Sequence, residues 1–201
     1  MNQANTNNPR QQSSGNLGLQ ALAHGSVFLL LIVTLWVLET WLVPGQAGII
    51  RCLAATWAFL SGIALSHLIH EWGHFAGALI SGAKLTIKPA AHPLFFDFDY
   101  DHNKPRQFLL MSMGGLLGNF LLLVTLLLLV TPASLITTSL LAAVIGQLVY
   151  VLILELPVSF GVMAGGAPLA VLTTHFSQGG PLFIRATLGA LVAAAAVFVL
   201  C

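Results

Sequence analysis

The fold is decided by residues 66–82, SHLIHEWGHFAGALISG, which place two histidines and a glutamate inside a long apolar stretch. That stretch, residues 53–81, is long enough to cross the roughly 30 Å hydrocarbon core of a membrane as a helix, which takes about 20 residues. A charged group inside such a span costs roughly 2.5–3.5 kcal/mol on insertion scales. A cluster of ionisable side chains at this depth therefore indicates a function.

The cluster consists of His70, Glu71 and His74, in the pattern HExxH. On a helix, residues i and i+4 lie on one face, so His70 and His74 can bind one metal ion. Glu71 then lies beside that metal, where it can take a proton from a water molecule. We therefore predict zinc as the cofactor, with His70 and His74 as ligands and Glu71 as the catalytic base. The motif lies about 10 Å from the expected end of the helix, at 1.5 Å per residue, so water is expected to reach it from one side only.

The composition of the chain is that of a membrane protein. Of its 201 residues, 57% are hydrophobic and only 6% are charged, and the mean hydropathy is +0.92. A soluble domain carries about 25% charged residues, so this chain has too few to cover a water-soluble surface. The sequence predicts an integral membrane protein surrounded by lipid. The formal net charge of +1 gives no indication of a nucleic-acid partner.

Five apolar segments separated by Pro and Gly predict about five transmembrane helices, at residues 24–43, 53–81, 107–131, 134–156 and 182–200. The fold class is thus an all-α polytopic membrane protein. We expect a disordered polar tail over residues 1–22 and a single transmembrane domain over residues 23–201. The Gly- and Pro-rich stretch 157–181, which starts directly after the fourth segment, is predicted to be irregular or re-entrant.

The one sizeable polar loop, residues 82–106, is expected to be partly β or irregular, because it alternates in part and is rich in Phe. It holds four basic residues, against the single Arg51 between the first two spans. Basic residues gather on the cytoplasmic side of membrane proteins, so we expect this loop to be cytoplasmic. The expected location is a bacterial inner (cell) membrane.

Two stretches resemble the site-2 protease family of intramembrane zinc metalloproteases. Residues 66–85, SHLIHEWGHFAGALISGAKL, resemble the first signature of that family, and residues 114–120, GGLLGNF, resemble its glycine-x-x-x-asparagine motif. The resemblance covers roughly residues 53–168. It implies a zinc-dependent endopeptidase that cleaves a membrane-anchored peptide or protein. It also implies that the glycines allow close helix packing and that Asn119 binds the substrate backbone.

The third zinc ligand of that family, an aspartate before a glycine, is not matched. The corresponding residues, 155–166, read ELPVSFGVMAGG, and Ala164 stands where the aspartate is expected. A catalytic zinc normally has three protein ligands. Glu155 is the leading candidate for the third ligand, and the alternative is a helix-end carboxylate at the membrane interface. The other candidates have simpler readings as solvated, interfacial or hydrogen-bonding groups: Asp97, Asp99, Asp101, His175 and His67.

Two other functions fit the same residues. A catalytically inactive relative that kept the metal-binding helix can serve as a membrane scaffold or chaperone, and Ala164 favours that alternative. A metal-ion carrier is favoured by the seven histidines but opposed by their single close cluster. Metal content per chain and cleavage of a membrane peptide separate these three functions.

Overall fold

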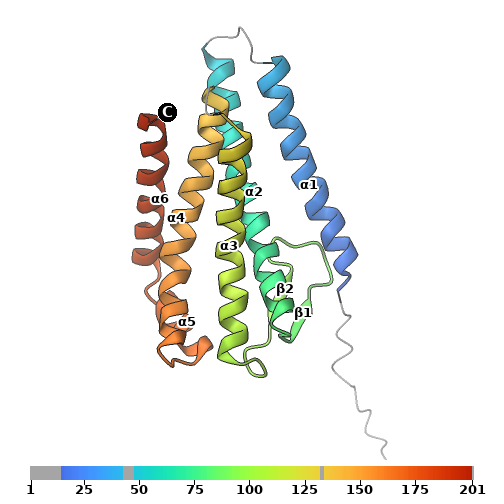
Figure 1. Cartoon of the computed structure of the whole chain (residues 1–201), viewed down its shortest axis with the longest axis vertical. Helices are drawn as coiled ribbons and strands as arrows, with labels where there is room; N and C mark the ends of the chain where they lie inside the picture. The colour runs from blue at the N-terminus through green and yellow to red at the C-terminus, as the bar shows by residue number, and fades with distance from the viewer. Residues whose placement is uncertain (1–14, 43–47, 132–133, 201) are drawn as a thin grey trace, which may run out of the picture.

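The computed structural model describes residues 15–42, 48–131 and 134–200. Its elements are helix α1, Leu17–Val37, continued by a π-helical turn η1, Leu38–Leu42; α2, Ile49–Ile80; strands β1, Leu85–Ile87, and β2, Phe96–Phe98; and helices α3, Pro105–Leu129, α4, Leu135–Met163, α5, Pro168–Phe176, and α6, Gly180–Leu200. Helices α2, α3 and α4 pack together, α6 covers α4, and α1 leans away from α2 toward its lower end (Figure 1).

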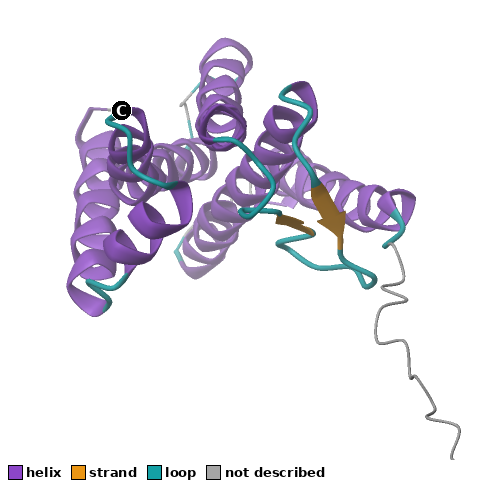
Figure 2. Ribbon diagram, turned by 90° about the horizontal axis from the view of Figure 1, so that it is seen from below, coloured by secondary structure: helices purple, strands orange, loops and turns teal. Residues whose placement is uncertain are grey.

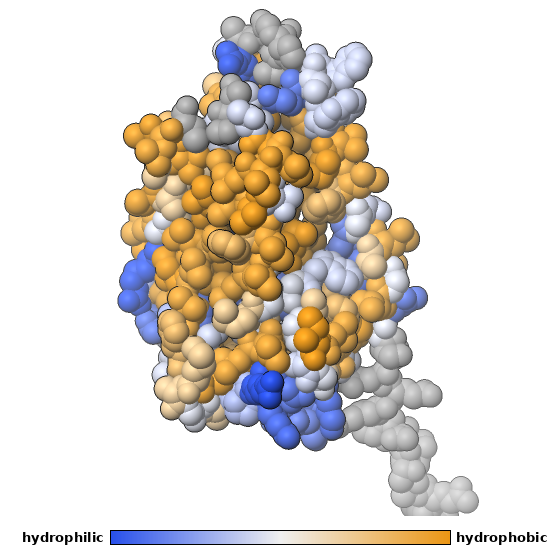
Figure 3. Space-filling view, viewed as in Figure 1, coloured by the Kyte–Doolittle hydropathy of each residue, from blue (hydrophilic) through white to orange (hydrophobic). Residues whose placement is uncertain are grey.

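The predicted membrane architecture is confirmed by five helices that are long and apolar enough to span a bilayer. Apolar side chains cover the middle of the molecule, whereas hydrophilic side chains gather mainly at its ends (Figure 3). The helices therefore turn their leucine, isoleucine, valine and phenylalanine side chains toward lipid, and the protein is an integral membrane protein.

The loop between the second and third spans contains the short β structure that its alternating sequence predicts. Strands β1 and β2 form an antiparallel hairpin in which Leu85 pairs with Phe98 and Ile87 pairs with Phe96. Seen from below, this hairpin lies between α1 and the lower end of α2 (Figure 2). It thus sits at the end of the bundle where α2 carries the HExxH motif.

The first span begins earlier than the sequence predicts. Helix α1 starts at Leu17, so the prediction of a disordered tail through residue 22 is wrong for residues 17–22; residues 1–14 lie outside the described part of the chain. The side chain of Asn16 accepts a hydrogen bond from the backbone N–H of Leu19 and caps the helix. The polar Gln20 is fully buried because it bonds to the loop, which offsets the cost of placing an amide in the bundle.

The fourth span does not end at Pro157, and the prediction of an irregular stretch over residues 157–181 is wrong for most of it. Helix α4 continues through the proline to Met163, and α5 forms after a short turn. Beyond the proline, Val158 and Val162 are buried against Phe108 and Met111 of α3. A proline inside a membrane helix is tolerated where neighbouring elements compensate for the lost hydrogen bond, and this packing holds the last turns of α4 in place.

The closest helix pair, α2 with α3, meets at glycines. A Cβ atom on Gly73 would overlap the backbone oxygen of Gly114, and a Cβ atom on Gly114 would overlap the backbone oxygen of Gly73. Only glycine permits this approach of two backbones. The glycines of residues 114–118 therefore pack α3 against the motif helix, as the sequence predicts.

Candidate metal centre

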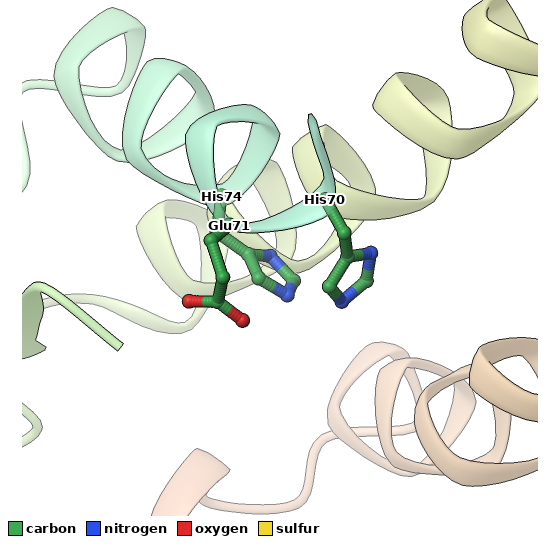
Figure 4. A group of neighbouring side chains, drawn as sticks. All are labelled: His70, Glu71 and His74. Carbon is green, nitrogen blue, oxygen red and sulfur yellow. The ribbon is translucent and has the colours of Figure 1, made fainter. Parts of the chain in front are cut away.

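The HExxH side chains lie on one face of α2. Figure 4 shows His70, Glu71 and His74 pointing into the same space from consecutive turns of the helix. The ring centroids of the two histidines are 4.2 Å apart. His70 is 4% exposed and Glu71 is 9% exposed. One ligand atom from each of the three side chains lies within 4.8 Å of the others, so helical spacing alone brings together a group that can hold a metal ion.

A fourth side chain, Glu155, reaches the same group from α4. Its Oε1 lies 2.7 Å from Nε2 of His70 and 3.4 Å from Nε2 of His74. Glu155 takes this position because α4 continues past Pro157, which makes it an interior helical residue instead of a helix-end residue. Ala164, at the position of the family's aspartate, is the exposed C-cap of α4. The structure therefore places Glu155, and not residue 164, against the two imidazoles.

The donor set fits zinc. In a tetrahedral site with bonds of about 2.0–2.1 Å, neighbouring ligand atoms are about 3.3 Å apart. Glu155 Oε1 lies 3.4 Å from Nε2 of His74, close to that spacing, whereas its 2.7 Å distance to Nε2 of His70 is that of a hydrogen bond and lengthens if both atoms bind one metal ion. The buried Oε2 of Glu155 has no hydrogen-bond partner among the described residues. Two carboxylates in a largely buried site also carry the charge that balances one divalent cation. Of the two carboxylates, Glu155 has its Oε1 at hydrogen-bonding distance from Nε2 of His70, and both Glu71 and Glu155 line the adjoining cavity.

Helix α3 fixes the orientation of both histidines. Nδ1 of His74 donates a hydrogen bond to the backbone oxygen of Met111 over 2.9 Å, which leaves Nε2 of His74 free to bind a metal. Gly115 makes room for this ring, since a Cβ there would lie 2.7 Å from Nδ1 and Nε2 of His74. Sequence reasoning missed the hydrogen bond to Met111, because every residue type has the same backbone acceptor.

Asn119 does not have the substrate-binding position that the sequence predicts. It is fully buried between the helices, and its Nδ2 lies 3.4 Å from Nδ1 of His70. It lies outside the lining of the cavity beside the HExxH group. The amide thus contacts the rear of a candidate metal ligand, and the proposed contact with a substrate backbone is not supported.

A cavity of about 330 Å³ opens beside Glu71, His74 and Glu155. The hairpin, α3, α4 and α5 supply its walls. Its aromatic lining consists of Phe96, Phe98, Tyr100, Phe108 and Phe176. Burial raises the pKa of the Tyr100 phenol above its usual value, so this wall stays uncharged at neutral pH. The cavity is large enough for an apolar side chain and exposes it to the carboxylates.

The loop above the site is held by a polar clamp from α1. Nε2 of Gln20 donates to the backbone oxygens of Lys88 and Ala90, and its Oε1 accepts from the N–H of His92. Nε2 of His24 donates to the backbone oxygen of His92 over 3.1 Å. The sequence signal for these contacts was the presence of two polar residues, Gln20 and His24, at the start of the first apolar segment.

Trp72, inside the HExxH motif, connects this clamp to the site. Its Nε1 donates to Nδ1 of His24 over 3.2 Å, and its ring packs on Phe75 and Phe95. The motif helix, the loop and α1 are therefore joined through one tryptophan.

The remaining candidates lie apart from the group. Asp97 pairs with Lys88 over 3.4 Å at the cavity. Asp99 accepts a hydrogen bond from Nδ1 of His102, which lowers the pKa of the Asp99 carboxyl below its ordinary value. Three further candidates from the sequence remain. Asp101 is exposed, His175 lies on α5, and His67 lies one turn before His70. Within the described ranges, the HExxH residues form one close group of potential ligands, and Glu155 reaches its two histidines from α4.

The chain matches no protein-family model, no curated protein and no solved structure. The function is therefore proposed from the site itself.

Proposed function

We propose that the protein is a zinc-dependent intramembrane endopeptidase, a divergent member of the site-2 protease family. The observation that carries this proposal is the position of Glu155, whose Oε1 lies within 3.4 Å of Nε2 of both HExxH histidines. Two histidines on one helix are too few ligands for a catalytic zinc, and a carboxylate from a second helix supplies the third. The cavity beside these side chains is lined by Glu71 as well as by His74 and Glu155.

The chain's own residues account for the proton transfers of peptide hydrolysis. Zinc, when bound, supplies a Lewis acid that polarises the scissile carbonyl and acidifies water. Glu71 takes a proton from the attacking water and delivers it to the leaving amine, so the carboxylate is regenerated. The aromatic walls limit the water that reaches the scissile bond.

The substrate class follows from the position of the site. The cavity lies at the end of the bundle where the hairpin packs, within reach of a chain that leaves the membrane. Its walls are mainly apolar, which favours a large apolar side chain next to the scissile bond. We infer that the substrate is a membrane-anchored peptide or protein.

We infer that the site faces the cytoplasm, because the loop over residues 82–106 holds four basic residues. The membrane that we propose is a bacterial inner membrane. In a background with Cys52 and Cys201 replaced by serine, a Lys104→Cys variant should resist a membrane-impermeant thiol reagent in intact cells and react after lysis. Efficient labelling of intact cells would place the loop, and the cavity, on the other side.

The enzymatic function is tested with purified protein in lipid vesicles and a library of membrane-anchored peptides. Wild-type protein should cleave a subset of the library, whereas Glu71→Gln, which keeps the side-chain shape but cannot accept a proton, should bind zinc and cleave nothing. Zinc binding without any cleavage by the wild type would support the inactive scaffold or chaperone instead. Cleavage by Glu71→Gln at the wild-type rate would show that Glu71 is not the base.

A further inference from the structure

Asn119 is a buried polar side chain in which one of the two polar atoms has no hydrogen-bond partner among the described residues. Its relative exposure is 0%, and it lies on α3 directly behind the ring of His70. Its Nδ2 is 3.4 Å from Nδ1 of His70, while its buried Oδ1 has no partner among the described residues. An unpaired amide oxygen in an apolar bundle is costly, so this arrangement calls for an explanation.

The hydrogen bonds of His70 depend on which ring nitrogen carries the proton. The amide nitrogen of Asn119 faces Nδ1 of His70, and Nε2 of the same ring lies 2.7 Å from Glu155 Oε1. The tautomer that satisfies both contacts has its proton on Nε2, from which it donates a hydrogen bond to Glu155. That tautomer has no lone pair on Nε2 for a metal ion. Metal binding therefore requires the proton to move to Nδ1, where it needs an acceptor.

The amide of Asn119 can provide that acceptor by rotating half a turn. Its oxygen and nitrogen are nearly equal in shape, so rotation exchanges the donor for the acceptor without repacking the helices. His74 differs, because its Nδ1 already has a permanent acceptor in the backbone oxygen of Met111. One histidine is thus fixed in the metal-binding tautomer, and the other faces a group that can serve either tautomer.

We propose that Asn119 is a positioning residue that orients His70 and, by turning its amide oxygen toward Nδ1, stabilises the tautomer that binds zinc. This inference depends on the proposed zinc site. Asn119 acts through His70 and does not contact the substrate. Oδ1 of Asn119, which is buried and has no partner among the described residues, is the atom that accepts a hydrogen bond from Nδ1–H of His70 in the metal-binding tautomer.

The test compares the zinc affinity of Asn119→Leu and Asn119→Asp, measured by competition with a chelator of known affinity. Loss of a hydrogen-bonding partner behind a metal-bound histidine typically lowers metal affinity 10–100-fold, so Asn119→Leu should show that loss. Asn119→Asp keeps an acceptor and should bind zinc at least as tightly as wild type. Ser61→Ala, which removes a buried hydroxyl without a partner from α2, is the control and should not change zinc affinity. Equal affinities for wild type and Asn119→Leu, or equal losses in both Asn119 variants, would overturn the inference.

A second measurement separates this inference from the zinc site itself. In metal-free, ¹⁵N-histidine-labelled protein, the Nδ1 resonance of His70, assigned through His70→Gln, should move in Asn119→Leu and stay in place in Ser61→Ala. An unmoved resonance would refute the contact whether or not zinc binds. A moved resonance in a protein that binds no zinc would retain the contact and refute the metal site, and with it the role proposed for Asn119.

Discussion

Replacing Gly115 with alanine tests the packing of α3 on the candidate metal site. The added Cβ would lie 2.7 Å from Nδ1 and Nε2 of His74, whereas ordinary contacts between such atoms are about 3.5 Å or longer. The imidazole must therefore move by nearly 1 Å, and its hydrogen bond to Met111 is disturbed. Overpacking of this kind costs about 1–3 kcal/mol. At 1.4 kcal/mol per factor of ten, the affinity for zinc should fall roughly 5- to 150-fold.

The assay is a competition titration of zinc against a chelator, using protein in detergent micelles. Gly25→Ala on α1 is the matched control, because its added Cβ has no atom within 4 Å. Gly25→Ala should bind zinc as wild type does. Wild-type zinc affinity in Gly115→Ala would refute the argument that α3 holds the His74 ring in its binding position.

Three further predictions concern the loop, an exposed ion pair and the degenerate motif. Gln20→Ala should make residues 88–92 more sensitive to limited proteolysis and lower the free energy of unfolding by about 1–3 kcal/mol, since three part-buried hydrogen bonds to the loop backbone are lost. An unchanged digestion pattern would show that Gln20 does not hold the loop. The hydrogen bond from His102 lowers the pKa of Asp99, so it stabilises the fold at pH values above the ordinary carboxyl pKa. This stabilisation is lost as the pH falls through the lowered pKa of Asp99. His102→Ala should therefore raise the Asp99 pKa in a carbon-detected NMR titration, and an unchanged pKa would contradict this pairing. Ala164→Asp should leave zinc affinity unchanged, because residue 164 is exposed at the end of α4. A higher zinc affinity would mean that residue 164, where site-2 proteases have a ligand aspartate, lies close to the metal.

The sequence was most informative where the relevant interactions are local. The apolar segments and the HExxH spacing depend on one helix at a time, so the spans and the shared face of His70 and His74 could be read directly. The glycines of residues 114–118 predicted close packing, because no other residue allows it. The structure agrees with the sequence on the five spans, the shared face and the close packing, although the first span begins earlier and the fourth ends later than predicted.

The errors arose where contacts between distant residues overrule local preference. Pro157 normally ends a helix, but the burial of Val158 and Val162 carries α4 onward. Gln20 reads as part of a polar tail until its bonds to the loop, 68 residues away or more, are known. The partner of Asn119 is equally remote, because His70 is 49 positions away in the sequence.

The central claim, a zinc ion held by His70, His74 and Glu155, is tested most directly by X-ray absorption at the zinc edge, combined with zinc content per chain. Wild-type protein should hold about one zinc, with two imidazole nitrogens at about 2.0–2.1 Å and a carboxylate oxygen at about 2.0–2.2 Å. Glu155→Ala should lose most of its zinc, as His74→Ala should. Wild-type protein that holds no zinc, or a Glu155→Ala variant that keeps zinc with the same coordination, would contradict the account.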